Sequence, residues 1–96
     1  MADIVHRRVV VAGAVQGVFF RDSCRQEAVA RGVAGWVRNR LDGTVEAVFE
    51  GAPERVAEML AWTRHGPSAA SVDEVSVEDG RPEGLTGFEV RPSARS

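Results

Sequence analysis

The residues with the clearest chemical potential lie between positions 13 and 21. They run Gly13-Ala14-Val15-Gln16-Gly17-Val18-Phe19-Phe20-Arg21. Glycines let a backbone approach a ligand closely, and successive N–H groups in a curled loop form a concave anion site. Arg21 adds a planar guanidinium that matches two oxygens of a phosphate. The segment fits a phosphate cradle, although by spacing alone a glycine-containing turn followed by a surface arginine is the simpler interpretation.

The spacing of the loop glycines excludes one common nucleotide motif. Three residues separate Gly13 from Gly17, and no third glycine follows at the dinucleotide spacing. All twelve Lys/Arg positions are arginine. A Walker-type loop, which needs its Gly-Lys pair, and a lysine Schiff base are therefore excluded. We expect Phe19 and Phe20 to anchor the loop in the core.

Asn39 is the second candidate. It lies in the segment 34–40, whose composition predicts a β-strand, and asparagine is disfavoured in strands. A residue that breaks the local rule is a mild indication of function. Asparagine is also common near turns, and Asp42-Gly43 follows closely. The pattern alone leaves a functional and a structural role equally open.

Seven elements are expected around these candidates. Valines 9 to 11 favour a central strand, and Asp42-Gly43 favours a hairpin. The expected strands are 5–13, 34–40, 44–50, 72–77 and 85–91, and the expected helices are 22–31 and one that starts at Pro53 and ends at Gly66-Pro67. The order β-α-β-β-α-β, with a short extra strand, predicts an α+β fold. It is the ferredoxin-like two-layer sandwich, with two helices on one face of a mainly antiparallel sheet.

Composition narrows the class of protein. The 96 residues predict a single domain over 1–96, and the net charge is −2. An acidic chain argues against general nucleic-acid binding, which needs a basic face. No stretch approaches the ~18 apolar residues of a membrane span, and residues 1–8 lack the apolar run of a signal peptide. We therefore expect a cytoplasmic protein that binds neither nucleic acid nor membranes. We expect a monomer, because no large exposed apolar stripe is evident.

The remaining side chains that could be reactive are interpreted as structural rather than catalytic. Cys24 is expected to pack on the apolar stripe of the first helix, as a small buried hydrophobe. His6 and His65 lack neighbouring ligands at metal-site spacing. Asp42 and Glu46 resemble an acid–base pair, but a turn former and a solvated strand residue are the simpler interpretations.

Two motifs together resemble the acylphosphatase family. The first is Gly13-x-Val15-Gln16-Gly17-Val18-x-Phe20-Arg21, and the second is Gly35-Trp36-Val37-Arg38-Asn39 followed by Asp42-Gly43-x-Val45-Glu46. A weaker third match is Gly66-Pro67 with Ala70, Val72 and Val75. The matches run from residue 13 to residue 75 in the family's order. No position that the family uses for chemistry departs from its pattern.

The resemblance implies an enzyme that hydrolyses the carboxyl–phosphate bond of small-molecule acyl phosphates, without metal, cofactor or covalent intermediate. Carried over by motif, Arg21 and loop amides would hold the phosphoryl group, and Asn39 would position water. The residues that would supply those amides are Val15, Gln16, Gly17, Val18, Phe19 and Phe20. The chemistry agrees, because a carboxylate leaves without a strong general acid and the transition state needs mainly fixed donors.

Two other functions share this order of elements. A phosphate-binding sensor or carrier module would need Arg21 and the loop but not Asn39, whose presence favours the enzyme. An RNA-recognition domain would need aromatic residues along the exposed face of its central strands. The expected strand 5–13 has none, so RNA recognition is the least favoured function.

Overall fold

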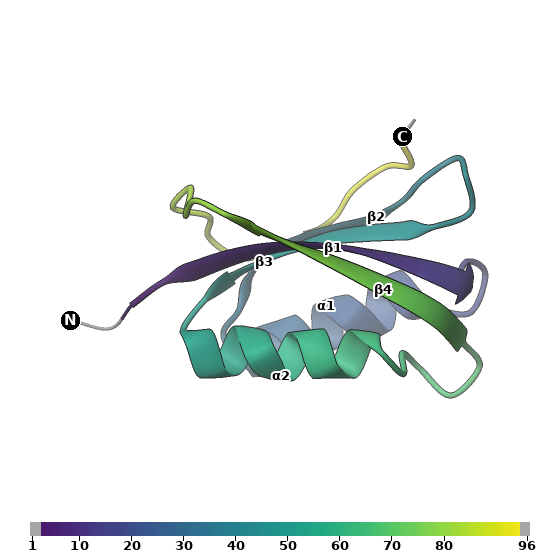
Figure 1. Cartoon of the computed structure of the whole chain (residues 1–96), viewed down its shortest axis with the longest axis horizontal. Coiled ribbons are helices and arrows are strands. Elements are labelled where there is room, and N and C mark those ends of the chain that lie inside the picture. Colours follow the sequence, from purple (N-terminus) through teal and green to yellow (C-terminus); the bar gives the residue numbers. More distant parts are fainter. Residues whose placement is uncertain (1–2, 95–96) are drawn as a thin grey trace.

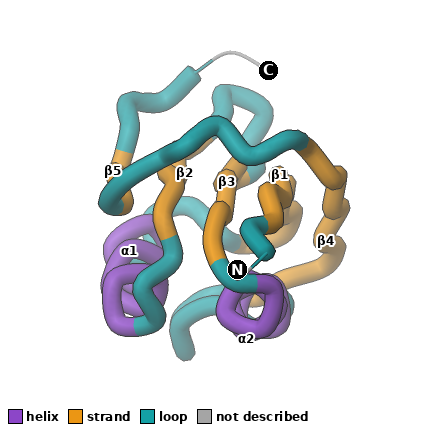
Figure 2. The backbone as a smooth tube through the Cα atoms, turned by 90° about the vertical axis from the view of Figure 1, so that its left-hand side faces the viewer, coloured by secondary structure: helices purple, strands orange, loops and turns teal. Residues whose placement is uncertain are grey.

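A computed structural model describes residues 3–94 (Figure 1). Residues 1–2 and 95–96 of the predicted domain lie outside the described residues. The elements are β1 (Val5–Ala14), α1 (Phe20–Ala30), β2 (Ala34–Asn39), β3 (Val45–Gly51), α2 (Pro53–Thr63), β4 (Ser71–Gly80) and β5 (Phe88–Val90). The strands form one sheet in the order β4-β1-β3-β2-β5, and both helices cover the same face of it (Figure 2). The predicted ferredoxin-like sandwich is therefore confirmed.

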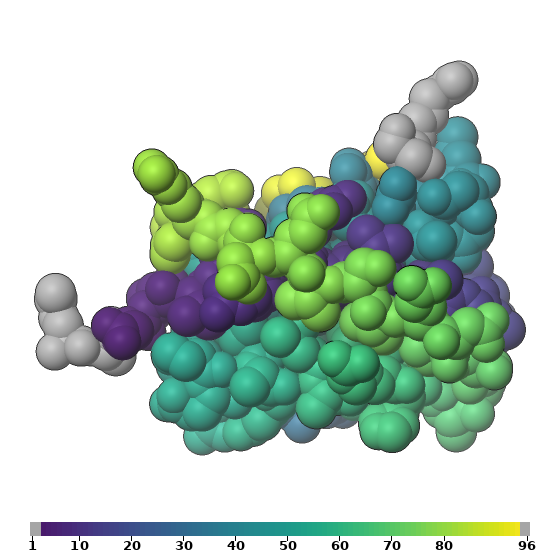
Figure 3. Space-filling view, in the orientation of Figure 1, coloured from purple at the N-terminus to yellow at the C-terminus, as the bar shows by residue number. Residues whose placement is uncertain are grey.

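The pairing sets the direction of each strand. β3 is antiparallel to both of its neighbours, β1 and β2, so β1 and β2 run in the same direction. β4 pairs antiparallel with β1 at one edge, and it crosses in front of β1 in the space-filling view (Figure 3). The chain then crosses over the helix-free face to β5, which pairs in parallel with β2 (Figure 2).

Predicted and observed boundaries differ mainly at three elements. α1 begins at Phe20 rather than at residue 22. β4 continues to Gly80, beyond residue 77, because its polar end still pairs with Arg7 and Arg8 of β1. β5 begins at Phe88 rather than at residue 85, because Leu85 belongs to the crossover.

The core lies between the sheet and the helices. Alternate residues of the inner strands, such as Val9, Val37 and Phe49, point toward the helices and are fully buried. Cys24 of α1 is buried among them, which confirms its packing role. Burial and, to a smaller extent, the charge of Glu27 raise the pKa of the Cys24 thiol far above its ordinary value. A buried, neutral thiol is chemically inert.

The interpretation of Glu46 as a solvated strand residue is wrong. Its buried carboxylate lies on the helix-free face, where Oε2 accepts a hydrogen bond from Arg8 Nε (2.6 Å) and Oε1 accepts one from Arg38 Nε (2.7 Å). The arginines come from the strands on either side of β3. The guanidinium of Arg38 also lies 4.8 Å from the centre of the Trp36 ring. Glu46 thus joins three strands.

A second buried glutamate, Glu50, holds the crossover. Its carboxylate accepts hydrogen bonds from the amides of Glu83 and Leu85, both at 2.7 Å, and Nδ1 of His6 lies 2.8 Å from it. Burial opposes ionisation of Glu46 and Glu50, but the donors around each carboxylate outweigh it and lower the pKa. Both carboxylates therefore contribute to the fold in their ionised form.

Acidification is expected to destabilise the fold through these carboxylates. A glutamate with a lowered folded-state pKa contributes stability above its unfolded-state pKa of about 4.3, and the contribution is lost as the pH falls through the folded-state value. Urea unfolding should therefore show a free energy of unfolding that falls below about pH 5. Glu50→Gln should be less stable at neutral pH and lose less stability on acidification. A wild-type pH slope in this variant would contradict the assignment.

Candidate active site

The two segments singled out in the sequence meet at one end of the molecule. Because β1 and β2 run in the same direction, their last residues, Ala14 and Asn39, lie at the same end of the sheet. The loop after β1 leads directly into α1, whose first turn contains Arg21 (Figure 1). The β2–β3 hairpin lies at this end as well. The topology thus brings the glycine loop, Arg21 and Asn39 to one region.

The loop between β1 and α1 curls through two left-handed residues. Gly17 has φ +74°, and Phe19 has φ 64° and ψ 24°. Residues of opposite backbone hand turn neighbouring N–H groups toward one side, which makes a concave anion site. In the described part of the chain, the amides of Gln16, Gly17, Val18 and Phe19 donate to no backbone carbonyl. These donors are available to a ligand.

The two remaining amides of the predicted set differ from these. The Val15 N–H already donates to the Gly13 carbonyl at 3.0 Å, and its side chain is buried. Val15 therefore shapes the loop, while its amide has an acceptor inside the protein. Phe20 is the first residue of α1, where an amide has no intrahelical acceptor. The partial positive charge of a helix N-terminus adds to the attraction for an anion.

The two phenylalanines of the loop have opposite environments. Phe20 is buried against Trp62, with ring centroids 5.1 Å apart, so its predicted role as a core anchor is confirmed. Gly66 gives this ring its room, because a Cβ there would lie 2.6 Å from Cε2 of Phe20. The same prediction is wrong for Phe19, whose side chain is 77% exposed. The left-handed backbone at Phe19 turns the chain into α1, so the two successive side chains point in different directions.

Arg21 is half-buried and lacks a carboxylate partner within residues 3–94. Most arginines do have one: Arg7, Arg8, Arg31, Arg38, Arg40, Arg55 and Arg91 each lie within 4.0 Å of an acidic side chain. Arg21 instead borders a shallow depression of ≈ 290 Å³, together with Gly17, Phe19 and Asp22. Asn39 is not among the residues that line this depression. On binding an anion, the guanidinium has no ion pair with the described residues to give up.

Asn39 ends β2 on the helix-covered side of the sheet. It pairs with Val45, which pairs in turn with Val11, and both valines are buried in the core. Directly paired residues share a face, so the Asn39 side chain points to the same side as these valines. Its Oδ1 is buried and accepts no hydrogen bond from the described residues. A buried, unsatisfied acceptor costs about 1–3 kcal/mol, so the fold maintains an unfavourable group here.

Gln16 connects the loop to the hairpin that carries Asn39, a role that sequence analysis missed. Its Nε2 donates to the carbonyls of Arg40 (2.8 Å) and Thr44 (2.9 Å). Arg40 directly follows Asn39, and its amide donates a hydrogen bond to the Thr44 carbonyl across the hairpin. The side chain of Gln16 thus holds the cradle at a set distance from the end of β2.

Gln16→Ala is expected to lower kcat/KM by about tenfold, because a 1 Å displacement of aligned groups costs up to about 10²-fold. The free energy of unfolding should fall by only about 1 kcal/mol, since exposed hydrogen bonds contribute modestly. Steady-state kinetics and urea unfolding measure the two effects. Gln16→Glu keeps the length, loses both donors and adds a negative charge, so it should lower kcat/KM at least as much as the alanine variant. Wild-type kinetics in both variants would show that the bridge has no role in positioning.

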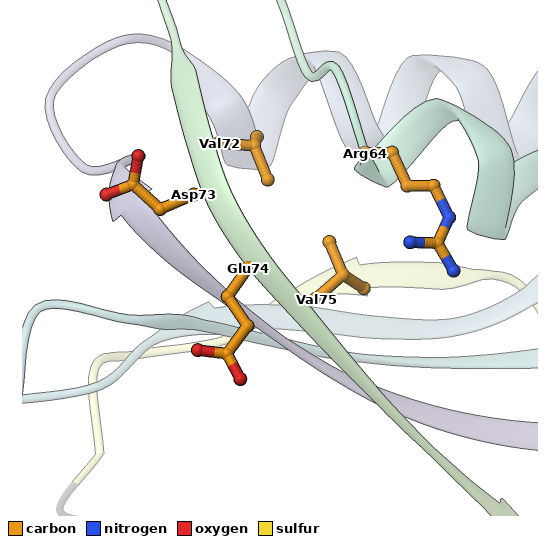
Figure 4. A pocket seen from close by; sticks show the side chains of 5 residues that line it. All are labelled: Arg64, Val72, Asp73, Glu74 and Val75. Atoms are coloured by element: carbon orange, nitrogen blue, oxygen red, sulfur yellow. The ribbon is translucent and has the colours of Figure 1, made fainter.

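A second depression, of ≈ 320 Å³, lies along β4 (Figure 4). Arg64, Asp73 and Glu74 line it together with two valines. Arg64 and Asp73 lie on opposite sides of the β4 ribbon, so their charged groups do not converge on one point (Figure 4). Within the described residues, no group of three or more His, Cys, Asp or Glu side chains gathers as metal ligands do. The cradle beside Arg21 remains the better candidate site.

Comparison with known proteins identifies the family to which the chain belongs. The acylphosphatase family model matches residues 7–90. An acylphosphatase of Gloeobacter violaceus is 54% identical over 94% of this chain and 97% of its own length. The solved structure of an acylphosphatase from Coxiella burnetii shares the fold, with a TM-score of 0.89 and 37% identity over 93% of this chain and 94% of that chain. An acylphosphatase structure from Bacillus subtilis also shares it, with a TM-score of 0.87 and 36% identity over 91% of this chain and 98% of that chain. The chain therefore belongs to the acylphosphatase family. Neither helix of the described chain has the length and apolar character of a membrane span.

Proposed function

We propose that this protein hydrolyses the carboxyl–phosphate bond of small acyl phosphates, giving a carboxylate and inorganic phosphate. Family membership supports this activity. The observation that carries the mechanism is the Asn39 Oδ1, an acceptor buried without a partner among the described residues. It lies at the end of the sheet where the amides of residues 16–19 donate to no backbone carbonyl of the described chain. Unused donors suit phosphoryl oxygens, and an unused acceptor suits the O–H of a water molecule.

The phosphoryl group is held by Arg21 and by the amides of residues 16–20. Arg21 donates two parallel hydrogen bonds to two phosphoryl oxygens, and the amides of the curled loop surround the third. These donors are fixed by the fold before the substrate arrives, so no reorganisation is needed as charge develops in the transition state. Val15, whose amide is bonded to Gly13, supports the loop from the core.

Asn39 orients the attacking water. Its Oδ1 accepts one O–H of the water, which directs an oxygen lone pair toward phosphorus, opposite the acyl oxygen. The new bond forms between the water oxygen and phosphorus, and the bond from phosphorus to the acyl oxygen breaks. The acyl oxygen leaves with the electron pair as a carboxylate, and the protons of the water stay with the phosphate. No general acid is required, because the leaving carboxylate is stable without a proton.

This mechanism uses only side chains and amides of the chain, so we propose that it needs neither a metal nor a cofactor. We also propose that the enzyme acts as a cytoplasmic monomer. The large apolar side chains that are exposed belong to six separate segments of the described chain: Ile4, Phe19, Val29, Leu41, Val77 and Val90. Scattered apolar residues of this kind are normal on a monomer.

Turnover of benzoyl phosphate, followed by loss of absorbance, tests the proposal. Wild type is expected to hydrolyse it at an equal rate with and without a chelator, and inorganic phosphate is expected to inhibit competitively. p-Nitrophenyl phosphate, whose leaving group is not a carboxylate, should be a poor substrate. Folded protein that binds phosphate but hydrolyses no acyl phosphate would contradict the enzyme and identify a binding module.

A further inference from the structure

Phe19 combines two unfavourable features that the cradle alone does not require. Its backbone is left-handed, at φ 64° and ψ 24°, a conformation that is costly for a bulky residue. Among residues 3–94, Phe19 is the one non-glycine residue with a positive φ. Its ring is 77% exposed, more than any other large apolar side chain in this part of the protein. Strained residues cluster at ligand-binding sites, where the strain is maintained by function. The ring therefore needs a role outside the fold.

The position of Phe19 indicates what its ring contacts. It borders the ≈ 290 Å³ depression together with Gly17, Arg21 and Asp22. If the phosphoryl group binds Arg21 and the loop amides as proposed, the acyl group is one bridging oxygen away, and this depression beside Arg21 is the space that it would enter. Gly17 leaves room for it, because a Cβ at Gly17 would meet nothing within 4 Å. The acyl group thus meets one aromatic ring and one carboxylate.

We infer that Phe19 determines substrate specificity by packing its ring against the acyl group, so that the enzyme prefers acyl phosphates with a flat, apolar acyl group. The inference rests on the proposed function. An aromatic acyl group gains both buried apolar area and ring–ring contact, and an acetyl group gains little of either. Asp22, an exposed residue that borders the same depression, disfavours an acyl group that carries its own negative charge.

The test compares substrates within each variant, so that loss of the cradle and loss of specificity are separated. The variants are Phe19→Asn, because asparagine tolerates the left-handed backbone, and Phe19→Leu, which keeps apolar bulk without a ring. Val29→Asn is the matched control, since it replaces an exposed apolar residue on α1 about 15 Å further along the helix. The measurement is kcat/KM for benzoyl phosphate divided by kcat/KM for acetyl phosphate, with folding checked by circular dichroism.

The ratio is expected to fall about tenfold in Phe19→Asn and about threefold in Phe19→Leu, and to stay at the wild-type value in Val29→Asn. If Phe19→Asn does not fold, the ratio in Phe19→Leu decides. An equal loss for both substrates would overturn the inference, because Phe19 would then act only through the backbone of the cradle. Asp22→Asn should raise kcat/KM for succinyl phosphate relative to benzoyl phosphate, and an unchanged ratio would remove the charge argument. Wild type that hydrolyses none of these substrates would refute the proposed function itself.

Discussion

Asn39→Ala is expected to lower kcat for benzoyl phosphate by about 10²–10³-fold, the loss typical of removing one group that orients or stabilises the reacting atoms. Inorganic phosphate should still bind, because the amides and Arg21 are unchanged. The same substitution should leave the free energy of unfolding unchanged or raise it. It removes the buried Oδ1 that has no partner among the described residues, and such a group costs about 1–3 kcal/mol. Activity should thus fall without any loss of stability.

Three measurements on one preparation check this result: kcat, the inhibition constant of inorganic phosphate, and urea unfolding. Asn39→Asp is the matched variant, because it keeps the shape and an acceptor oxygen but places a negative charge beside the phosphoryl group. It should bind phosphate more weakly than Asn39→Ala. A rise in KM with unchanged kcat in Asn39→Ala would assign Asn39 to substrate binding and contradict its role in positioning water.

Arg21→Ala is expected to weaken phosphate binding by about 10–100-fold and to lower kcat/KM by at least as much. Hydrogen bonds to charged groups contribute about 1.5–3 kcal/mol, and 1.4 kcal/mol corresponds to tenfold. The free energy of unfolding should change by less than about 0.5 kcal/mol, because Arg21 forms no ion pair with the described residues. Steady-state kinetics with phosphate as inhibitor, together with urea unfolding, measure these effects.

The controls for Arg21 come from the same helix. Arg25 lies one turn further along α1, is exposed, and likewise has no acidic partner in the described chain. Arg25→Ala removes the same charge and should leave kcat/KM within about twofold. Arg21→Lys keeps the charge but loses the planar fork, so it should recover only part of the phosphate affinity. Equal losses in Arg21→Ala and Arg25→Ala would reduce the role of Arg21 to long-range attraction.

Much of this fold could be predicted because its signals are local. The valines at 9 to 11 predicted a central strand, and Asp42-Gly43 predicted the hairpin. Cys24 was expected on the apolar stripe of the first helix, and it is buried on α1 together with Phe20 and Ala28, which lie four residues to either side. These patterns depend on residues within a few positions of one another, which is the range over which backbone periodicity acts. The position of the candidate site then follows from the topology, because β1 and β2 run in the same direction and end at the same end of the sheet.

The wrong or missed predictions are of two kinds. They concern contacts between segments that are distant in the sequence, or a residue whose backbone is left-handed. Glu46 was predicted to be solvated, yet its partner Arg8 lies 38 positions away in the chain. Gln16 carries no sequence signal for its bonds to the hairpin carbonyls, because any residue supplies such acceptors. Phe19 was placed in the core because phenylalanine usually is, but its positive φ turned it outward. Composition and spacing do not report φ at a non-glycine residue.

Hydrolysis of benzoyl phosphate in ¹⁸O-labelled water tests most directly whether water attacks the phosphoryl group. The reaction is run with enough wild-type enzyme that uncatalysed hydrolysis is negligible, and both products are analysed by mass spectrometry. The proposed mechanism predicts one ¹⁸O atom in the inorganic phosphate and none in the benzoate. Label in the benzoate would show that water attacks the carbonyl carbon, and it would contradict the roles given to Arg21, the loop amides and Asn39.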